Sequence, residues 1–302
     1  MDAVRLNFTE GSLGALNVVL ALIMFGIALD LDLHRFREVA RTPRAIVGGL
    51  AGVFVLFPLA TAAIVRLLEP PPSVALGMLL VAASPGGNMS NFLTHLARGN
   101  TALSITLTGV STGIALVMTP LMFTTLATLD PRTAPLLRSF DLDAVGILRT
   151  FALIVLLPLA LGRLVAAQRP GLAARLSRPM KAFSILAFVG FVTMALRLNW
   201  PFFTAWVGQV AGWVALQDTV ALALGYALAT ALRLGEADRR AMAMECGIRN
   251  SGLALVLVFA FFGGLGGMAI TAAWWGVWHV VSGLSLAGWW SRRPPQPVVA
   301  HA

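Results

Sequence analysis

The sequence has little charge and only one cysteine. Of its 302 residues, 12% are charged, whereas soluble globular proteins carry about 25%. Cys246 stands alone, which excludes an internal disulfide and a CxxC metal site. Apolar residues make up 58% of the chain, in runs of about the 20 residues that a helix needs to span a bilayer. The composition therefore predicts an all-α polytopic protein embedded in the lipid bilayer.

The formal net charge of +9 raises the question of nucleic-acid binding. The basic residues instead fall in short loops between apolar runs, and most lie on the side reached after the first run. Cytoplasmic loops carry such an excess of Lys and Arg. We therefore expect the cell inner membrane, with the N-terminus outside, the C-terminus in the cytoplasm and no nucleic-acid partner. The sequence carries no signal about oligomeric state.

The apolar runs predict about nine transmembrane helices in a single domain, 1–302. The expected spans are 12–31, 44–66, 73–97, 101–128, 144–166, 182–198, 203–232, 237–262 and 266–290. Two of them are interrupted. Pro85, Gly86 and Gly87 break the third span, because proline and glycine do not sustain a regular helix. Gly247 and the stretch 250–252 break the eighth span.

Paired interruptions in two halves of a membrane chain indicate inverted repeats with a binding site near the bilayer midplane. The third and eighth spans correspond if the first half has lost its leading helix. We therefore expect repeat one over about 12–128, repeat two over about 144–290, and two discontinuous helices that cross. Unwound backbone within a bilayer is tolerated where it lines a cavity or is buried in protein.

Four motifs resemble the bile acid:sodium symporter family. They are IMFGIALDL (23–31), SPGGNMSNFLTHLARGNTALSITLTGVST (84–112), ECGIRNSGLA (245–254) and VWHVVSGLSLAGWW (277–290). The resemblance implies a panel domain and a core domain, with the broken helices crossing in the core. It also implies a secondary transporter that moves an organic anion together with sodium.

Sodium is a hard cation that prefers oxygen ligands. The resemblance assigns a first sodium site to five oxygen-bearing residues, whose types are all intact: Ser90, Asn91, Ser104, Thr108 and Glu245. Ser104 and Thr108 are four residues apart, so they share one helix face. The competing interpretation is that these hydroxyls pack or bond to the backbone of their own helix.

The family's second sodium site has lost both of its side-chain ligands here. The two glutamine positions are occupied by Arg249 and Val53. Two unit positive charges about 4 Å apart repel by about 4 kcal/mol at an effective dielectric constant near 20. We therefore expect one sodium ion, with Arg249 as a tethered charge in place of the second. Alternatively, Arg249 pairs with Glu245 four residues before it, and transport is sodium-independent or proton-coupled.

The organic anion is expected at the two breaks, where helix N-termini favour negative charge. The candidate contacts are Asn88, Asn250, Arg249 and His279. His279 stands where the family has a His-Asn pair, but Val280 replaces the Asn. Asp218 is a further intramembrane acid that either pairs with an Arg or lines the cavity.

Two other classes of function compete with transport. A membrane-embedded enzyme would need a nucleophile–base pair or a metal motif, and the sequence contains neither HExxH nor GxSxG. A sensor would bind the ligand without moving it. We expect a symporter and no enzymatic activity, with the substrate's identity open.

Overall fold

The structure is a computed structural model. It describes residues 2, 10–29, 43–140, 152–198, 200–293 and 295. The regular elements there are helical: α1 (Glu10–Leu29), α3 (Pro43–Ala51), η1 (Gly52–Leu56), α4 (Phe57–Leu68), α5 (Pro72–Ala83), α6 (Met89–Leu96), α7 (Thr101–Leu129), α8 (Ala134–Arg138), η2 (Ala152–Leu156), α10 (Leu157–Gln168), α11 (Pro170–Leu198), α12 (Trp200–Ala231), α13 (Glu236–Gly247), α14 (Ser251–Phe262) and α15 (Gly266–Ser291).

Most of these helices lie where the sequence predicts spans. The α11 helix, however, begins at Pro170, twelve residues before the predicted span 182–198, and the short α8 lies between two predicted spans. By length and apolar composition, Pro43–Leu68 and Trp200–Ala231 qualify as membrane spans, and Thr101–Ala115 with Val117–Leu129 qualifies as a pair bent by 68°. The bend lies at the residue four before Pro120, where a proline ring collides with the preceding turn. The first part of the predicted 144–166 span, 144–151, lies outside the described residues.

Large apolar side chains cover the outside of the helices. Leu67, Leu129 and Leu186 are each more than 70% exposed, at 78%, 72% and 71%. An apolar outer surface suits lipid contact and is unusual for a soluble monomer. The all-helical architecture agrees with a polytopic membrane protein.

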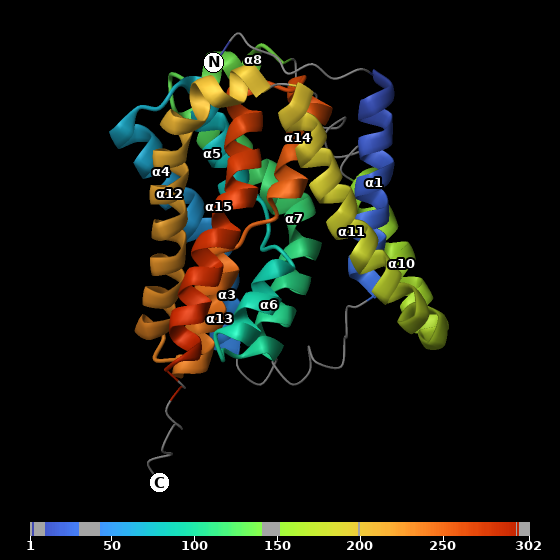
Figure 1. Ribbon diagram of the computed structural model, residues 1–302. Helices are drawn as coiled ribbons and strands as arrows, with labels where there is room; N and C mark the ends of the chain where they lie inside the picture. Colours follow the sequence, from blue (N-terminus) through green and yellow to red (C-terminus); the bar gives the residue numbers. More distant parts are fainter. Residues whose placement is uncertain are drawn as a thin grey trace.

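Three helices form a group at one side of the molecule. The α1, α10 and α11 helices pack on one another at the right of Figure 1, and the other long helices gather beside them. Within the larger group α12 packs along α13, and α15 packs along α5 and α12.

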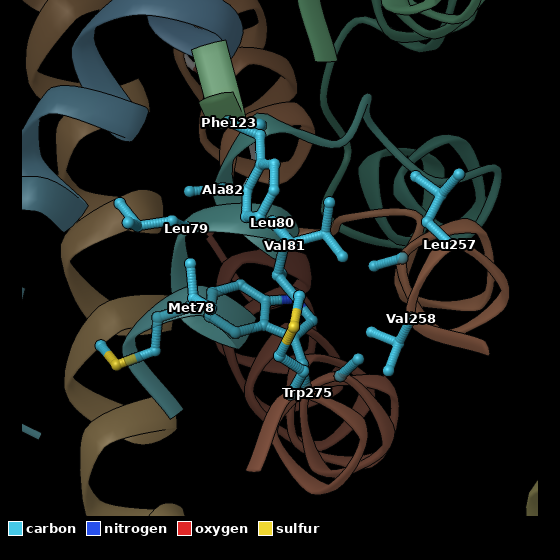
Figure 2. Packing of buried hydrophobic residues seen from close by; sticks show 14 of the residues in the cluster. Met78, Leu79, Leu80, Val81, Ala82, Phe123, Leu257, Val258 and Trp275 are labelled. Carbon is cyan, nitrogen blue, oxygen red and sulfur yellow. The ribbon is translucent and has the colours of Figure 1, made fainter. Parts of the chain in front are cut away.

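The main hydrophobic core surrounds α5. Its residues Met78–Ala82 lie among Trp275 of α15, Phe123 of α7 and Leu257 and Val258 of α14 (Figure 2). Trp275 is fully buried. This core holds the last turn of α5 in place, and the first break follows directly after it.

The two breaks meet each other. The first stretch, 84–88, separates α5 from α6, and the second, 248–250, separates α13 from α14. The backbone N–H of Gly87 donates to the Ile248 carbonyl at 2.8 Å, and that of Asn250 donates to the Pro85 carbonyl at 3.0 Å. These bonds make a short antiparallel bridge between Gly86 and Arg249. The breaks therefore satisfy each other's backbone groups inside the protein, as a membrane interior requires.

Candidate functional site

Glu245 is the centre of a buried hydroxyl cluster beside this bridge. Its Oε2 accepts hydrogen bonds from Ser90 and Thr108, each at 2.8 Å. Its Oε1 accepts a longer bond from Ser111, at 3.4 Å. The carboxylate is fully buried, and hydroxyl donors replace the water that it has lost.

Asn91 and Ser104 complete the cluster. The Ser104 hydroxyl donates to Asn91 Oδ1 at 2.8 Å, and the Thr108 hydroxyl lies 3.2 Å from the same oxygen. Ser104 and Thr108 are on one face of α7, as their spacing predicts, whereas Thr106 bonds back to Ala102. The structure thus brings together the residues Ser90, Asn91, Ser104, Thr108 and Glu245.

Thr108 Oγ1 has more oxygen neighbours within hydrogen-bonding distance than there are hydroxyl hydrogens to bond them. Thr108 Oγ1 lies 2.8 Å from Glu245 Oε2, 3.2 Å from Ser90 Oγ and from Asn91 Oδ1, and 3.0 Å from the Ser104 carbonyl. A threonine hydroxyl has one hydrogen to donate. Several of these oxygen pairs therefore face each other with lone pairs, which is an arrangement that a hard cation stabilises.

Gly86 allows the break to lie directly on this carboxylate. A Cβ atom at Gly86 would overlap Glu245 Oε1. A glycine is therefore required at this position if the first break is to contact Glu245.

Arg249 lies in the second break and is 1% exposed. Its Nη2 donates to the carbonyls of Val53 at 3.1 Å, Ala82 at 2.5 Å and Ser84, while its Nε is 3.5 Å from the Val81 carbonyl. The guanidinium carbon is 5.1 Å from the centroid of the Phe57 ring. A cation at the C-terminal end of α5 is favoured by the helix dipole and satisfies carbonyls that the helix leaves free.

The Val53 carbonyl is available because of the local helix geometry. Val53 belongs to the π-helical segment η1, in which the N–H of Phe57 bonds to the Gly52 carbonyl. In this i→i+5 pattern the Val53 carbonyl would accept a bond from the N–H of residue 58, but residue 58 is a proline and has no N–H. Val53 thus lacks a polar side chain but still offers a backbone oxygen, and Arg249 uses it.

Glu245 and Arg249 do not pair, contrary to one of the two alternatives. The ion pairs in the described part of the chain do not include either residue. The i,i+4 spacing brings side chains together only within a continuous helix. Here α13 ends at Gly247, and Ile248 has φ −94° and ψ 94°, so Arg249 turns toward α5 instead.

The expected substrate contacts lie in different surroundings. Asn88 is exposed at the start of α6 and makes no capping bond with its side chain. Asn250 caps α14 by accepting a bond from the Leu253 N–H at 3.0 Å. His279 is 6% exposed on α15, and within the described residues no hydrogen bond joins it to either break.

Asp218 and Gln217 occupy the middle of α12. Gln217 donates to Thr61 Oγ1 at 3.0 Å and to the Met78 carbonyl at 2.9 Å. Asp218 contacts the Ser282 hydroxyl at 2.5 Å. The expectation that Asp218 pairs with an Arg does not hold among the described residues, whose ion pairs leave it out.

Sequence reasoning missed two hydroxyls of the cluster. Ser111 lies near Glu245 Oε1, and Thr94 donates to Ser104 Oγ at 3.3 Å. Their helical spacing, one turn from Thr108 and from Ser90, was a usable signal. Within the described residues no group of three or more His, Cys, Asp or Glu side chains gathers. The possible metal ligands at this site are therefore mainly hydroxyl, amide and carbonyl oxygens.

Comparison with known proteins relates the chain to one family of transporters. Residues 17–206 match the model of the Sodium Bile acid symporter family. The chain is 31% identical over 278 residues to the uncharacterized sodium-dependent transporter YocS of Bacillus subtilis, which covers 92% of this chain and 83% of that protein. It is 30% identical over 280 residues to the probable sodium/metabolite cotransporter BASS1 of Arabidopsis thaliana, covering 92% and 67% respectively.

The alignment with a less similar relative covers a smaller share of that relative's length. The human P3 protein is 29% identical over 235 residues, which cover 78% of this chain and 48% of that protein. The family model alone spans more than half of the chain. The chain is therefore a multi-pass membrane protein and not an enzyme, and it belongs to the sodium bile acid symporter family.

Proposed function

We propose that this protein is a secondary transporter that carries an organic anion across the inner membrane together with one sodium ion. The observation that carries the proposal is the crowding of oxygen atoms around Thr108 beside the buried carboxylate of Glu245. The relatives named as a sodium-dependent transporter and a sodium/metabolite cotransporter support the same coupling.

The sodium ion would bind to Ser90, Asn91, Ser104, Thr108 and Glu245. In the structure the hydroxyl groups of Ser90 and Thr108 donate to Glu245. When a cation binds, the hydroxyl groups would rotate so that their lone pairs face the ion and their hydrogens point away from it. The ion would then have ligands from α6, α7 and α13 at once and would hold these three helices together. All of these ligands are neutral except the carboxylate, so they match a monovalent ion in charge.

Arg249 would take the place of a second sodium ion. Its guanidinium already binds the backbone oxygens of Val53, Ala82 and Ser84. Because arginine stays protonated and cannot leave, this position would supply a permanent positive charge at the crossing. That charge and the exposed Asn88 side chain are the groups that we expect an anionic substrate to meet.

The transport cycle would follow the division of the helices. We propose that α1, α10 and α11 form the panel, that the remaining long helices form the core, and that their relative movement opens the crossing to each side in turn. The inverted repeats, 12–128 and 144–290, and an outside N-terminus with a cytoplasmic C-terminus belong to the same proposal.

Proteoliposome uptake tests this function. A panel of organic acids that includes taurocholate and pyruvate is offered under an inward sodium gradient and under an equal potassium gradient. We expect accumulation of at least one acid with sodium only, and its loss in Glu245→Gln. Accumulation that is equal in potassium would favour a sodium-independent carrier, and binding without accumulation would favour a sensor.

A further inference from the structure

A second buried carboxyl group lies outside the hydroxyl cluster. Asp218 of α12 is 0% exposed. Within the described part of the chain its Oδ1 has no hydrogen-bond partner. Its Oδ2 lies 2.5 Å from the hydroxyl of Ser282 on α15. A buried carboxylate with one donor and no counter-ion is costly.

The hydroxyl of Ser282 has two acceptors within reach. It lies 2.5 Å from Asp218 Oδ2 and 3.2 Å from the carbonyl of His279. A serine hydroxyl has a single hydrogen to donate. Both bonds form at once if Asp218 Oδ2 itself carries a hydrogen and donates it to Ser282, which then donates to His279.

Among the residues that the structure describes, no ion pair neutralises an ionised Asp218. The elements packed on this part of α12 bring His279 on α15, Glu245 and Cys246 in the last turn of α13, and Arg249 in the break. Arg249 is bonded to the carbonyls of α5 and η1. Further cations on the elements that contact α12 include Arg44, Arg66 and Arg197, which stand in the terminal turns of α3, α4 and α11. Arg240 of α13 is bonded to Glu236 and to the Ala97 carbonyl.

Asp218 lies beside the second break. A Cβ atom at Gly247 would lie 3.6 Å from Asp218 Oδ1. Gly247 is the last residue of α13, two residues after Glu245. The carboxyl group therefore lies where α12, α15 and the second break meet, and a movement of these elements changes its surroundings.

We propose that Asp218 is a proton-binding site of this transporter, separate from Glu245, and that its proton is exchanged during the transport cycle. In the state seen here the carboxyl group is protonated and donates to Ser282. When α15 or the second break moves away and admits water, the O–H bond breaks and the proton passes to water. The return movement requires the carboxylate to take a proton back.

Infrared spectroscopy of the purified chain tests the proton site without any substrate. We expect a carboxylic-acid C=O band near neutral pH that is lost in Asp218→Asn. It should persist in Glu245→Gln and in Asp130→Asn, a matched change in a loop. Ser282→Ala should shift the band to higher frequency, because the acid loses its acceptor. A missing band in wild type, or one unchanged by Asp218→Asn, would overturn the proposal.

The link to transport rests on the proposed function and is tested separately. With taurocholate and pyruvate as probe anions, we expect sodium-driven uptake to fall at alkaline pH in wild type and in Asp130→Asn, and that pH dependence to be absent from Asp218→Asn. An identical pH profile in Asp218→Asn would overturn the proton exchange. If no probe is taken up at all, the proposed function fails, while the infrared band still decides the proton site.

Discussion

Removal of the Arg249 guanidinium should lower the free energy of unfolding, because this group joins the second break (248–250) to α5 and η1. In Arg249→Met the carbonyls of Val53, Ala82 and Ser84 lose their donor while they stay buried. An unsatisfied buried acceptor costs about 1–3 kcal/mol, so three give about 3–9 kcal/mol. The buried charge that is removed offsets part of this cost, so we take a net loss of about 3 kcal/mol, toward the low end of that range.

Thermal unfolding of the detergent-purified protein measures this loss. At about 2 °C per kcal/mol for a chain of this size, we expect Arg249→Met to unfold about 6 °C below wild type in potassium buffer. Sodium should recover part of the loss, because the freed carbonyls offer oxygen ligands to the ion, and a ligand at about 100 times its Kd contributes about 2.7 kcal/mol.

Arg240→Met is the matched control. Arg240 is also buried and donates to the carbonyls of Ala97, Trp290 and Arg293, near the first turn of α13. It should lose comparable stability but gain no more from sodium than wild type does. An unfolding temperature of Arg249→Met equal to that of wild type, or an equal sodium effect in both variants, would refute the reasoning.

Three further predictions concern the two sodium positions and one ion pair in a loop. Replacing both Val53 and Arg249 by Gln should raise the Hill coefficient for sodium from near one to near two in uptake assays; no change would count against Arg249 as a tethered charge. Gly86→Ala should abolish sodium-dependent uptake while the chain still reaches the membrane, because the new methyl group overlaps the Glu245 carboxylate; retained uptake would contradict that contact. Burial raises the pKa of Asp130, but hydrogen bonds and charge from Arg132 outweigh it, so the net pKa is lowered. Asp130→Asn should therefore unfold at a lower temperature than wild type at neutral pH, and the difference should shrink as the pH falls below the ordinary Asp value, which thermal unfolding across pH would check.

The sequence allowed most helices and both breaks to be placed closely, although α11 begins twelve residues before its predicted span. Long apolar runs fix spans, and Pro85 removes an N–H and biases Ser84 toward the extended conformation, so the end of α5 is a local property. The face shared by Ser104 and Thr108 is equally local. The assembly of Glu245 with Ser90 and Thr108 came from the family resemblance, because no pattern in one sequence brings α6, α7 and α13 together.

The partner of Arg249 could not be predicted from spacing. Four residues separate it from Glu245, and a regular helix would pair them. The end of α13 at Gly247 changes the direction of the side chain, and the acceptors it finds are backbone oxygens, which no residue type in the sequence reveals. The free carbonyl of Val53 depends on a π-helical turn before Pro58, and such a turn has no distinct sequence pattern.

Equilibrium binding of radioactive sodium to the purified protein tests the central claim most directly. Wild type and Glu245→Gln are compared over the same range of sodium concentrations, with Asp130→Asn as a control for the loss of one acidic residue. We predict one sodium ion per chain in wild type and in the control, and none in Glu245→Gln. Two ions per chain, or binding that survives Glu245→Gln, would contradict a single sodium site at Glu245.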